Sequence, residues 1–411
     1  MKSANQPARL LAALALVLSA TALRAEKAAP TLEDRLARLE SAIERIEKRL
    51  NDTVSADELA PTLKEYNDLT KALGWDGKSP LSAVKPAGKE KSLTLGGFVQ
   101  GNFESGTTAP DARFAGINNR FLLRRARLFV TGAFAEDVSF KVESDFGANT
   151  LSNKAGLAGQ LTDAYLSWTK LPEASLRFGQ FKTPFGYEQL ASDTKIPTIE
   201  RSLPNDRLTI GRQVGAMVFG DLAAKRLSYS LAAYNGTSTN NNINDNQKFL
   251  WVGRVAGVLV DTKSGANKVK LTAGANYFAT SDKANTTLAT TFNGHRYGSG
   301  VDAQFVYGPA EFQGEWLENR LHPLTGLATK ANGWSVLAAY TFAPKWQGVV
   351  RYESYDSNAA TLNTTTNLWT FGINYFLKGD DLKLSLDYLS DQQPAPAPRG
   401  DRVIGRVQVM F

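Results

Sequence analysis

The last residues of the chain, Asp401 to Phe411, read DRVIGRVQVMF. An apolar set alternates there with a mostly polar one: Val403, Gly405, Val407, Val409 and Phe411 against Arg402, Ile404, Arg406, Gln408 and Met410. Successive side chains of a β-strand point to opposite faces of the sheet, so this stretch predicts a strand with one apolar and one polar face. Such alternation over about ten residues is typical of a transmembrane β-strand.

The same alternation occurs in earlier parts of the chain. It separates Val138, Phe140 and Val142 from Lys141, Glu143 and Asp145, and Val269, Leu271 and Ala273 from Lys268, Lys270 and Thr272. If the apolar sets face lipid, the charged sets face the interior of the barrel. Buried charges must be paired or hydrated, so the pattern predicts a water-filled interior.

Sixteen such segments follow one another between residues 93 and 411. They begin near residues 92, 119, 138, 160, 174, 211, 226, 247, 267, 294, 310, 333, 345, 367, 381 and 401. Very short connections alternate with long polar ones, which include 106–118, 183–210, 236–246, 320–332 and 356–366. Outer-membrane barrels have short periplasmic turns and long external loops. We therefore expect an all-β, 16-stranded antiparallel outer-membrane β-barrel with both ends in the periplasm.

The amino-terminal residues predict export. Lys2 and Arg9 precede an apolar run from Leu10 to Leu18, and small residues follow, which is the layout of a signal peptide over residues 1–25. With no cysteine in 411 residues, stability cannot come from disulfides. No later stretch reaches the roughly 20 apolar residues of a membrane-spanning helix. The expected location is the outer membrane of a Gram-negative cell, in contact with its lipid.

Residues 26–73 have a helical period instead. A heptad seam is formed by Leu32, Leu36, Leu39, Ile43, Ile46 and Leu50. The seam fits either a parallel, self-associating coiled coil or a lone amphipathic helix that packs on the barrel mouth. A second short helix fits Ser55 to about Leu73, and residues 74–92, rich in Gly, Pro and Lys, form a linker. We expect a periplasmic helical segment and, from the seam, a homotrimer.

Catalysis and nucleic-acid binding have little support. The two histidines are His295 and His322, and Ser299 lies too far along the strand from His295 to form a catalytic pair. The sequence contains no metal-ligand cluster, phosphate-binding loop or cofactor motif. Basic residues account for the net charge of +7 but are scattered singly, whereas nucleic-acid binders cluster them. No enzyme, cofactor, metal or nucleic-acid partner is expected.

Three motifs resemble the phosphate-selective porin O and P family: LTLGGFVQGNF from Leu93, FLLRRARLFVTG from Phe121 and LRFGQFKTPFGYEQL from Leu176. The resemblance covers essentially all of residues 93–411. It implies a trimeric channel for anions, in which the third loop folds inward at the constriction. That loop, about 183–210, carries Lys195, Arg201 and Arg207 with Glu188, Asp193, Glu200 and Asp206. This mixed charge argues against strict selectivity for phosphate.

Alternation also predicts which charged residues line the pore. The inward basic set is Arg125, Arg127, Lys141, Arg177, Arg254, Lys268, Lys270, Arg296, Arg351, Lys383, Arg402 and Arg406, and the inward acidic set is Glu143, Asp145, Asp163, Asp302, Glu311, Glu315, Glu353 and Asp387. The basic set is the larger, so the hypothesis is passive diffusion of small anions, with phosphate and polyphosphate among the candidates. Arg125, Arg127 and Arg177 are the leading selectivity residues.

Other interpretations stay open. Each inward cation could instead form a structural salt bridge with an acidic neighbour in the lumen. The channel could be a general, non-selective porin, or the barrel could serve mainly as an envelope tether through its coiled coil.

Overall fold

The computed structural model describes residues 92–106, 119–135, 137–147, 159–285, 292–392 and 400–411. The predicted signal peptide, the helical segment 26–73 and all but the last residue of the linker 74–92 lie outside these residues. None of the helices in the described ranges is long and apolar enough to cross a membrane.

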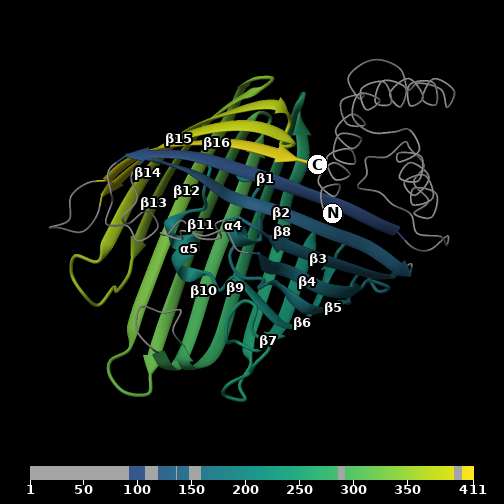
Figure 1. Cartoon of the computed structure of the whole chain (residues 1–411), viewed down its shortest axis with the longest axis vertical. Helices are drawn as coiled ribbons and strands as arrows, with labels where there is room; N and C mark the ends of the chain where they lie inside the picture. The colour runs from purple at the N-terminus through teal and green to yellow at the C-terminus, as the bar shows by residue number, and fades with distance from the viewer. Residues whose placement is uncertain (1–91, 107–118, 136, 148–158, 286–291, 393–399) are drawn as a thin grey trace, which may run out of the picture. The chain divides into compact units, whose positions relative to one another are not determined.

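The described chain forms one closed antiparallel barrel, in which each strand pairs with the next and β1 pairs with β16 (Figure 1). The strands are β1 Ser92–Gly106, β2 Arg120–Ala135, β3 Val138–Asp145, β4 Gln160–Trp168, β5 Ser175–Lys182, β6 Arg212–Leu222, β7 Leu227–Tyr234, β8 Leu250–Ser264, β9 Asn267–Asn285, β10 Phe292–Tyr307, β11 Ala310–Pro323, β12 Thr329–Ala343, β13 Trp346–Asp356, β14 Thr365–Lys378, β15 Leu382–Gln392 and β16 Gly400–Met410. The predicted sixteen-stranded barrel is confirmed, and each predicted start lies within four residues of the observed one.

The two faces of β16 are those that the alternation predicts. Arg402, Arg406 and Gln408 are buried inside the barrel, whereas Val403 and Val407 are exposed on its outer surface. The chain end closes the seam with β1, because the Phe411 carbonyl accepts a hydrogen bond from the Gly97 amide at 2.9 Å and the Phe411 amide donates to the Gly97 carbonyl at 3.0 Å.

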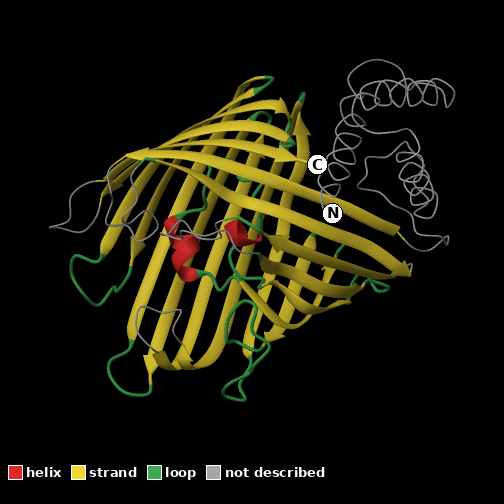
Figure 2. Cartoon of the chain, in the orientation of Figure 1, coloured by secondary structure: helices red, strands yellow, loops and turns green. Residues whose placement is uncertain are grey.

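The connection between β5 and β6, residues 183–211, folds into the barrel (Figure 2). We call it the inward loop. It contains two short helices, α4 (Tyr187–Leu190) and α5 (Leu203–Leu208). Ser202 caps α5, since its hydroxyl accepts a hydrogen bond from the Asn205 amide at 3.2 Å. Phe185 and Leu208 of the loop join the largest buried apolar cluster, together with Phe278 and Leu317 of the wall.

Two details differ from the sequence-based expectation. The connection predicted at 320–332 spans only residues 324–328, because the polar ends of β11 and β12 still pair, with Arg320 opposite Lys330. Lys263, expected in a turn, lies near the end of β8 opposite Lys268, and the turn itself is at 265–266. At these two places the charged residues do not mark the strand ends, because the hydrogen-bonded pairing of the strands continues beyond their apolar residues.

Candidate functional site

A β-bulge in β2 turns two successive arginines toward the barrel interior. Gln100 of β1 pairs with Arg125 and Gly101 pairs with Leu123, so Arg124 is the extra residue. Arg124 is 7% exposed and Arg125 is 3% exposed. Arg124 is absent from the inward set that alternation predicts. A signal was present, because strict alternation would place one of two successive arginines on the lipid face, where a cation is costly.

Both arginines bind Glu200 of the inward loop. Arg124 donates to the two carboxylate oxygens at 2.9 and 3.1 Å, Arg125 donates at 3.3 Å, and Arg406 of β16 forms a third ion pair. Burial by itself would raise the pKa of the Glu200 carboxyl, but the three guanidinium groups outweigh it and hold the pKa below its ordinary value. Glu200 is thus held as a carboxylate against the wall.

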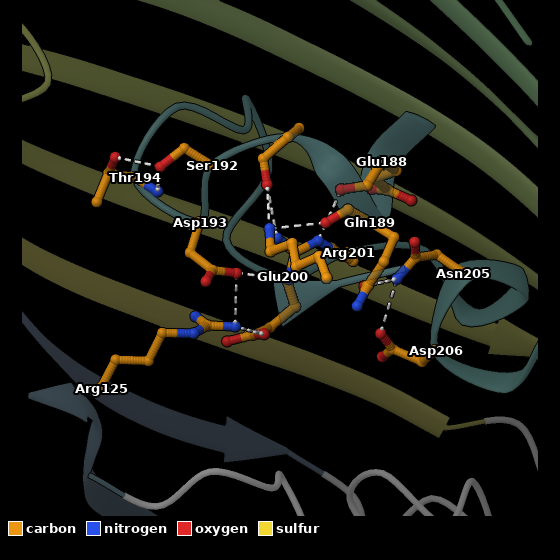
Figure 3. A network of polar contacts seen from close by, with 12 residues as sticks. Arg125, Glu188, Gln189, Ser192, Asp193, Thr194, Glu200, Arg201, Asn205 and Asp206 are labelled. Atoms are coloured by element: carbon orange, nitrogen blue, oxygen red, sulfur yellow. Dashed lines mark hydrogen bonds and ion pairs between the residues drawn. The ribbon is translucent and has the colours of Figure 1, made fainter. Parts of the chain in front are cut away.

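Asp193 forms a second anchor of the inward loop (Figure 3). Arg127 lies 2.7 Å away, Arg201 of the same loop 2.5 Å away and Arg125 3.4 Å away. Burial alone would raise the pKa of the Asp193 carboxyl, but Arg125, Arg201, Arg127 and Lys182 hold it well below its ordinary value. The inward loop therefore meets the β1–β2–β16 wall through its own carboxylates.

Elsewhere the polarity of the anchors is reversed, and wall carboxylates bind loop amides. Glu315 of β11 accepts a hydrogen bond from the Tyr187 amide at 2.5 Å, Glu353 of β13 from the Leu203 amide at 2.6 Å, and Asp387 of β15 from the Ile199 amide at 2.7 Å. These amides belong to the irregular backbone and helix starts of the loop, where the N–H groups lack helical partners. The carboxylates satisfy them.

Arg351 of β13 serves the same loop as a donor. Its Nη1 atom donates to the Thr198 hydroxyl at 2.7 Å, to the Glu200 carbonyl at 2.9 Å and to the Glu188 carboxylate at 3.3 Å. Glu188 also accepts both the amide and the hydroxyl of Ser202. The Nη1 atom of Arg351 therefore holds the loop, while Nη2 contacts the Glu353 carboxylate of its own strand at 3.3 Å.

A charged ladder continues along the wall from β3 to β6. Lys141 contacts Glu143 at 2.8 Å and Asp163 at 2.9 Å, and Arg212 contacts Asp163 at 2.7 Å. Arg127 joins this ladder to the loop anchors, because it contacts both Glu143, at 3.4 Å, and Asp193. In this connected network, formed by described residues, seven cations meet five carboxylates: Arg124, Arg125, Arg127, Lys141, Arg201, Arg212 and Arg406 with Glu143, Asp145, Asp163, Asp193 and Glu200.

Arg177 of β5 has a different environment. Its Nε atom donates to the Ser167 hydroxyl at 3.0 Å. Its guanidinium carbon lies 4.2 Å from the ring centre of Tyr165, 5.0 Å from that of Phe219 and 5.6 Å from that of Phe181. Within the described ranges it forms no ion pair. Arg177 is therefore a wall cation that aromatic rings hold in place.

The other predicted pore residues fall into two groups. Four cations contact wall or turn carboxylates: Arg254 with Asp302 at 2.6 Å, Arg296 with Asp282 at 2.9 Å, Lys383 with Asp380 at 3.2 Å and Arg402 with Glu104 at 3.8 Å. Two lysines near the 265–266 turn, Lys268 and Lys270, make no ion pair with described residues. On the inward loop, Arg201 is buried, whereas Lys195 and Arg207 are exposed. Their contact with passing anions stays a prediction.

One serine–histidine contact joins neighbouring strands. Ser281 of β9 and His295 of β10 approach to 2.9 Å between Oγ and Nδ1, at exposed positions. Among the described residues, His295 has no carboxylate partner that would orient its ring as a catalytic base. The described residues also contain no group of three metal-ligating side chains.

Comparisons with known proteins agree with this architecture. A family model described as "Phosphate-selective porin O and P" matches residues 94–411. A search of curated proteins found no significant match.

Several solved structures share the fold at low sequence identity. The outer membrane channel DcaP of Acinetobacter baumannii aligns with a TM-score of 0.56 and 14% identity, over 80% of this chain and 100% of that one. An anion-selective porin from Comamonas acidovorans gives 0.57 and 15%, over 78% and 100%. The trimer form of OmpT, an outer membrane protein of Vibrio cholerae, gives 0.55 and 11%, over 79% and 100%. At these identities the likeness concerns the fold.

Proposed function

Because the chain belongs to the phosphate-selective porin O and P family, we propose that this outer-membrane porin is a water-filled channel for passive diffusion of small anions, with phosphate and polyphosphate among the candidate solutes. Porin membership and the channel fold indicate a non-enzymatic role. A similar fold occurs in a structure titled as an anion-selective porin, which is consistent with the proposal.

The connected ion-pair network carries the proposal, because it gathers Arg124, Arg125, Arg127 and Arg406 on the wall beside the inward loop. Their carboxylate partners cancel much of this positive field, and the part that remains acts on a passing ion. At a narrow aqueous waist the effective dielectric constant is nearer 20 than 80, and one cation then stabilises an anion at 4 Å by about 4 kcal/mol. Exposed Lys195 adds a positive charge on the loop surface. The result is a waist that favours anions and still lets them leave.

Reversal potentials in a potassium chloride gradient test this selectivity. We expect wild-type channels in planar bilayers to prefer chloride over potassium, and the preference to shrink at 1 M salt, where the Debye length falls to about 3 Å. Lys195→Glu should move the reversal potential toward the cation side. Lys345→Glu, which changes the same charge in the turn between β12 and β13, is the matched control and should have little effect.

A reversal potential near zero in the wild type would support the general-porin alternative instead. Added phosphate should also lower the chloride current if oxyanions use the same path. Cation preference in the wild type would refute the proposal outright.

For assembly we propose a homotrimer with the amino-terminal segment in the periplasm after removal of residues 1–25. The heptad seam from Leu32 to Leu50 supports it, and a trimer form is named for one structure with the same fold. Native mass spectrometry in mild detergent should give three chains, and amino-terminal sequencing should begin near residue 26. Monomers alone, in full-length protein, would contradict the trimer. Envelope defects with normal conductance after deletion of 31–73 would favour the tether role.

A further inference from the structure

The guanidinium of Arg177 is arranged as a receptor for a carboxylate. Its Nε atom is held by the hydroxyl of Ser167, a side chain only 4% exposed, and three aromatic rings pack on it. Its two terminal nitrogens have no acceptor among the described residues. A carboxylate binds guanidinium edge-on through two parallel hydrogen bonds, while stacking uses the flat faces, so rings and ligand do not compete.

The position of Arg177 makes this arrangement accessible from the barrel interior. Arg177 pairs with Ser167 on β4 and with Met217 on β6, and all three belong to the inward-facing set. Tyr165 and Phe219 remain partly exposed at the edge of the buried apolar cluster. At this place on the wall, the guanidinium of Arg177 therefore lies beside the partly exposed rings of Tyr165 and Phe219.

This combination favours one class of anion over another. An inorganic phosphate dianion has four oxygens to satisfy, and one guanidinium among hydrocarbon rings leaves most of them without donors. A monocarboxylate with an aromatic body needs only the bidentate contact for its charge. Its body can then cover the rings of Tyr165 and Phe219 and remove apolar surface from water.

We propose that Arg177, Tyr165 and Phe219 form a binding site on the β4–β6 wall for monocarboxylates that carry an aromatic ring. The inference rests on the proposed anion channel, since such solutes must enter it. Ser167 is a positioning residue, because its hydroxyl accepts the Nε hydrogen bond and leaves both terminal nitrogens to a ligand.

Current block in planar bilayers tests this site with benzoate, acetate and phosphate as probes. We expect benzoate to reduce the chloride current at an about tenfold lower concentration than acetate, since covering part of one phenyl ring corresponds to about that change in affinity. Arg177→Gln should remove the difference between benzoate and acetate. Phe219→Leu, which keeps apolar volume but removes a ring, should reduce it.

Lys270→Gln is the control, because it removes one positive charge from β9 and leaves the β4–β6 wall intact. It should alter the currents of all three anions alike and keep the benzoate-to-acetate ratio. Strand content by circular dichroism confirms folding of each variant, and Arg177→Lys, which keeps the charge but loses the fork geometry, should show an intermediate ratio.

Equal block by benzoate and acetate in the wild type, or a ratio that survives Arg177→Gln in a folded channel, would overturn the inference. Reversal potentials in the same bilayers separate this result from the wider proposal. Anion preference without a benzoate effect removes only the aromatic site, whereas loss of anion preference removes the channel proposal.

Discussion

Alternation in the sequence predicts both Arg125 and Arg177 as inward-facing selectivity residues, but the two have different environments in the fold. Arg125 lies under the inward loop, where it contacts Glu200 and Asp193. Arg177 lies on the β4–β6 wall, where aromatic rings and one hydroxyl surround it. The first arginine holds the loop, and the second keeps donors for a solute. Inward direction alone therefore does not determine whether a lumen cation acts on structure or on permeation.

Among the variants that test this difference between Arg125 and Arg177, Glu200→Ala should have the largest effect on stability and conductance. It leaves the guanidiniums of Arg124, Arg125 and Arg406 without their shared carboxylate inside the barrel. Removing one partner of a buried ion pair costs about 3–5 kcal/mol. Lower thermal stability and a larger, noisier single-channel conductance should follow, because the inward loop loses its hold on β2 and β16.

Asp221→Asn at the exposed end of β6 is the matched loss of one carboxylate, and it should leave both readouts near wild type. The benzoate effect assigned to Arg177 should persist in Glu200→Ala. Unchanged stability and conductance in that variant would mean that the arginines under the loop do not anchor it.

A smaller effect is expected from Gly333→Val on β12. A Cβ atom at Gly333 would lie 2.9 Å from two side-chain carbons of Pro204 in α5 and 2.8 Å from the Ser354 carbonyl. Such overpacking costs about 1–3 kcal/mol and should displace α5, which a changed conductance would report. In the control Gly314→Val, the nearest atom lies 3.9 Å from the new Cβ, so the substitution should be tolerated. If Gly333→Val has the conductance of the wild type, the position of α5 does not control ion flow.

The smallest effect is expected from mild acid. The folded pKa of Glu200 lies below its ordinary value of 4.5, so its stabilisation is fully present above that pH and is lost as the pH falls through the lower, folded pKa. The difference in unfolding free energy between wild type and Glu200→Gln should therefore stay constant from pH 7 to about 5 and shrink only in stronger acid. A difference that already disappears near pH 6 would contradict the anchor at Arg124, Arg125 and Arg406.

The barrel could be predicted from the sequence because its signals are local. Alternation in DRVIGRVQVMF assigned the inner and outer faces of β16, and turn spacing gave the number of strands. The partners of the lumen cations could not be predicted, since Arg125 meets Glu200 across 75 positions and Arg406 meets it across 206. The periodicity of the sequence does not predict which wall residues an irregular loop of this length will contact.

Arg124 and Arg177 illustrate two intermediate cases. The pair Arg124–Arg125 contained enough information to infer a bulge, because strict alternation would have put a cation into lipid. Alternation placed Arg177 correctly on the inside, but its aromatic neighbours come from three strands. Tyr165 and Phe219 were assigned no role beside it from the sequence.

The seam between Gly97 and Phe411 has a consequence for how the molecule is made. The last hydrogen bonds of the barrel join residues more than three hundred positions apart, so closure carries the highest loop-closure cost of any pairing in the sheet. Until β16 has paired with β1, the sheet keeps two unpaired edges. A folding intermediate without this pairing is therefore prone to aggregate, and the pairing of these two strands removes both edges at once.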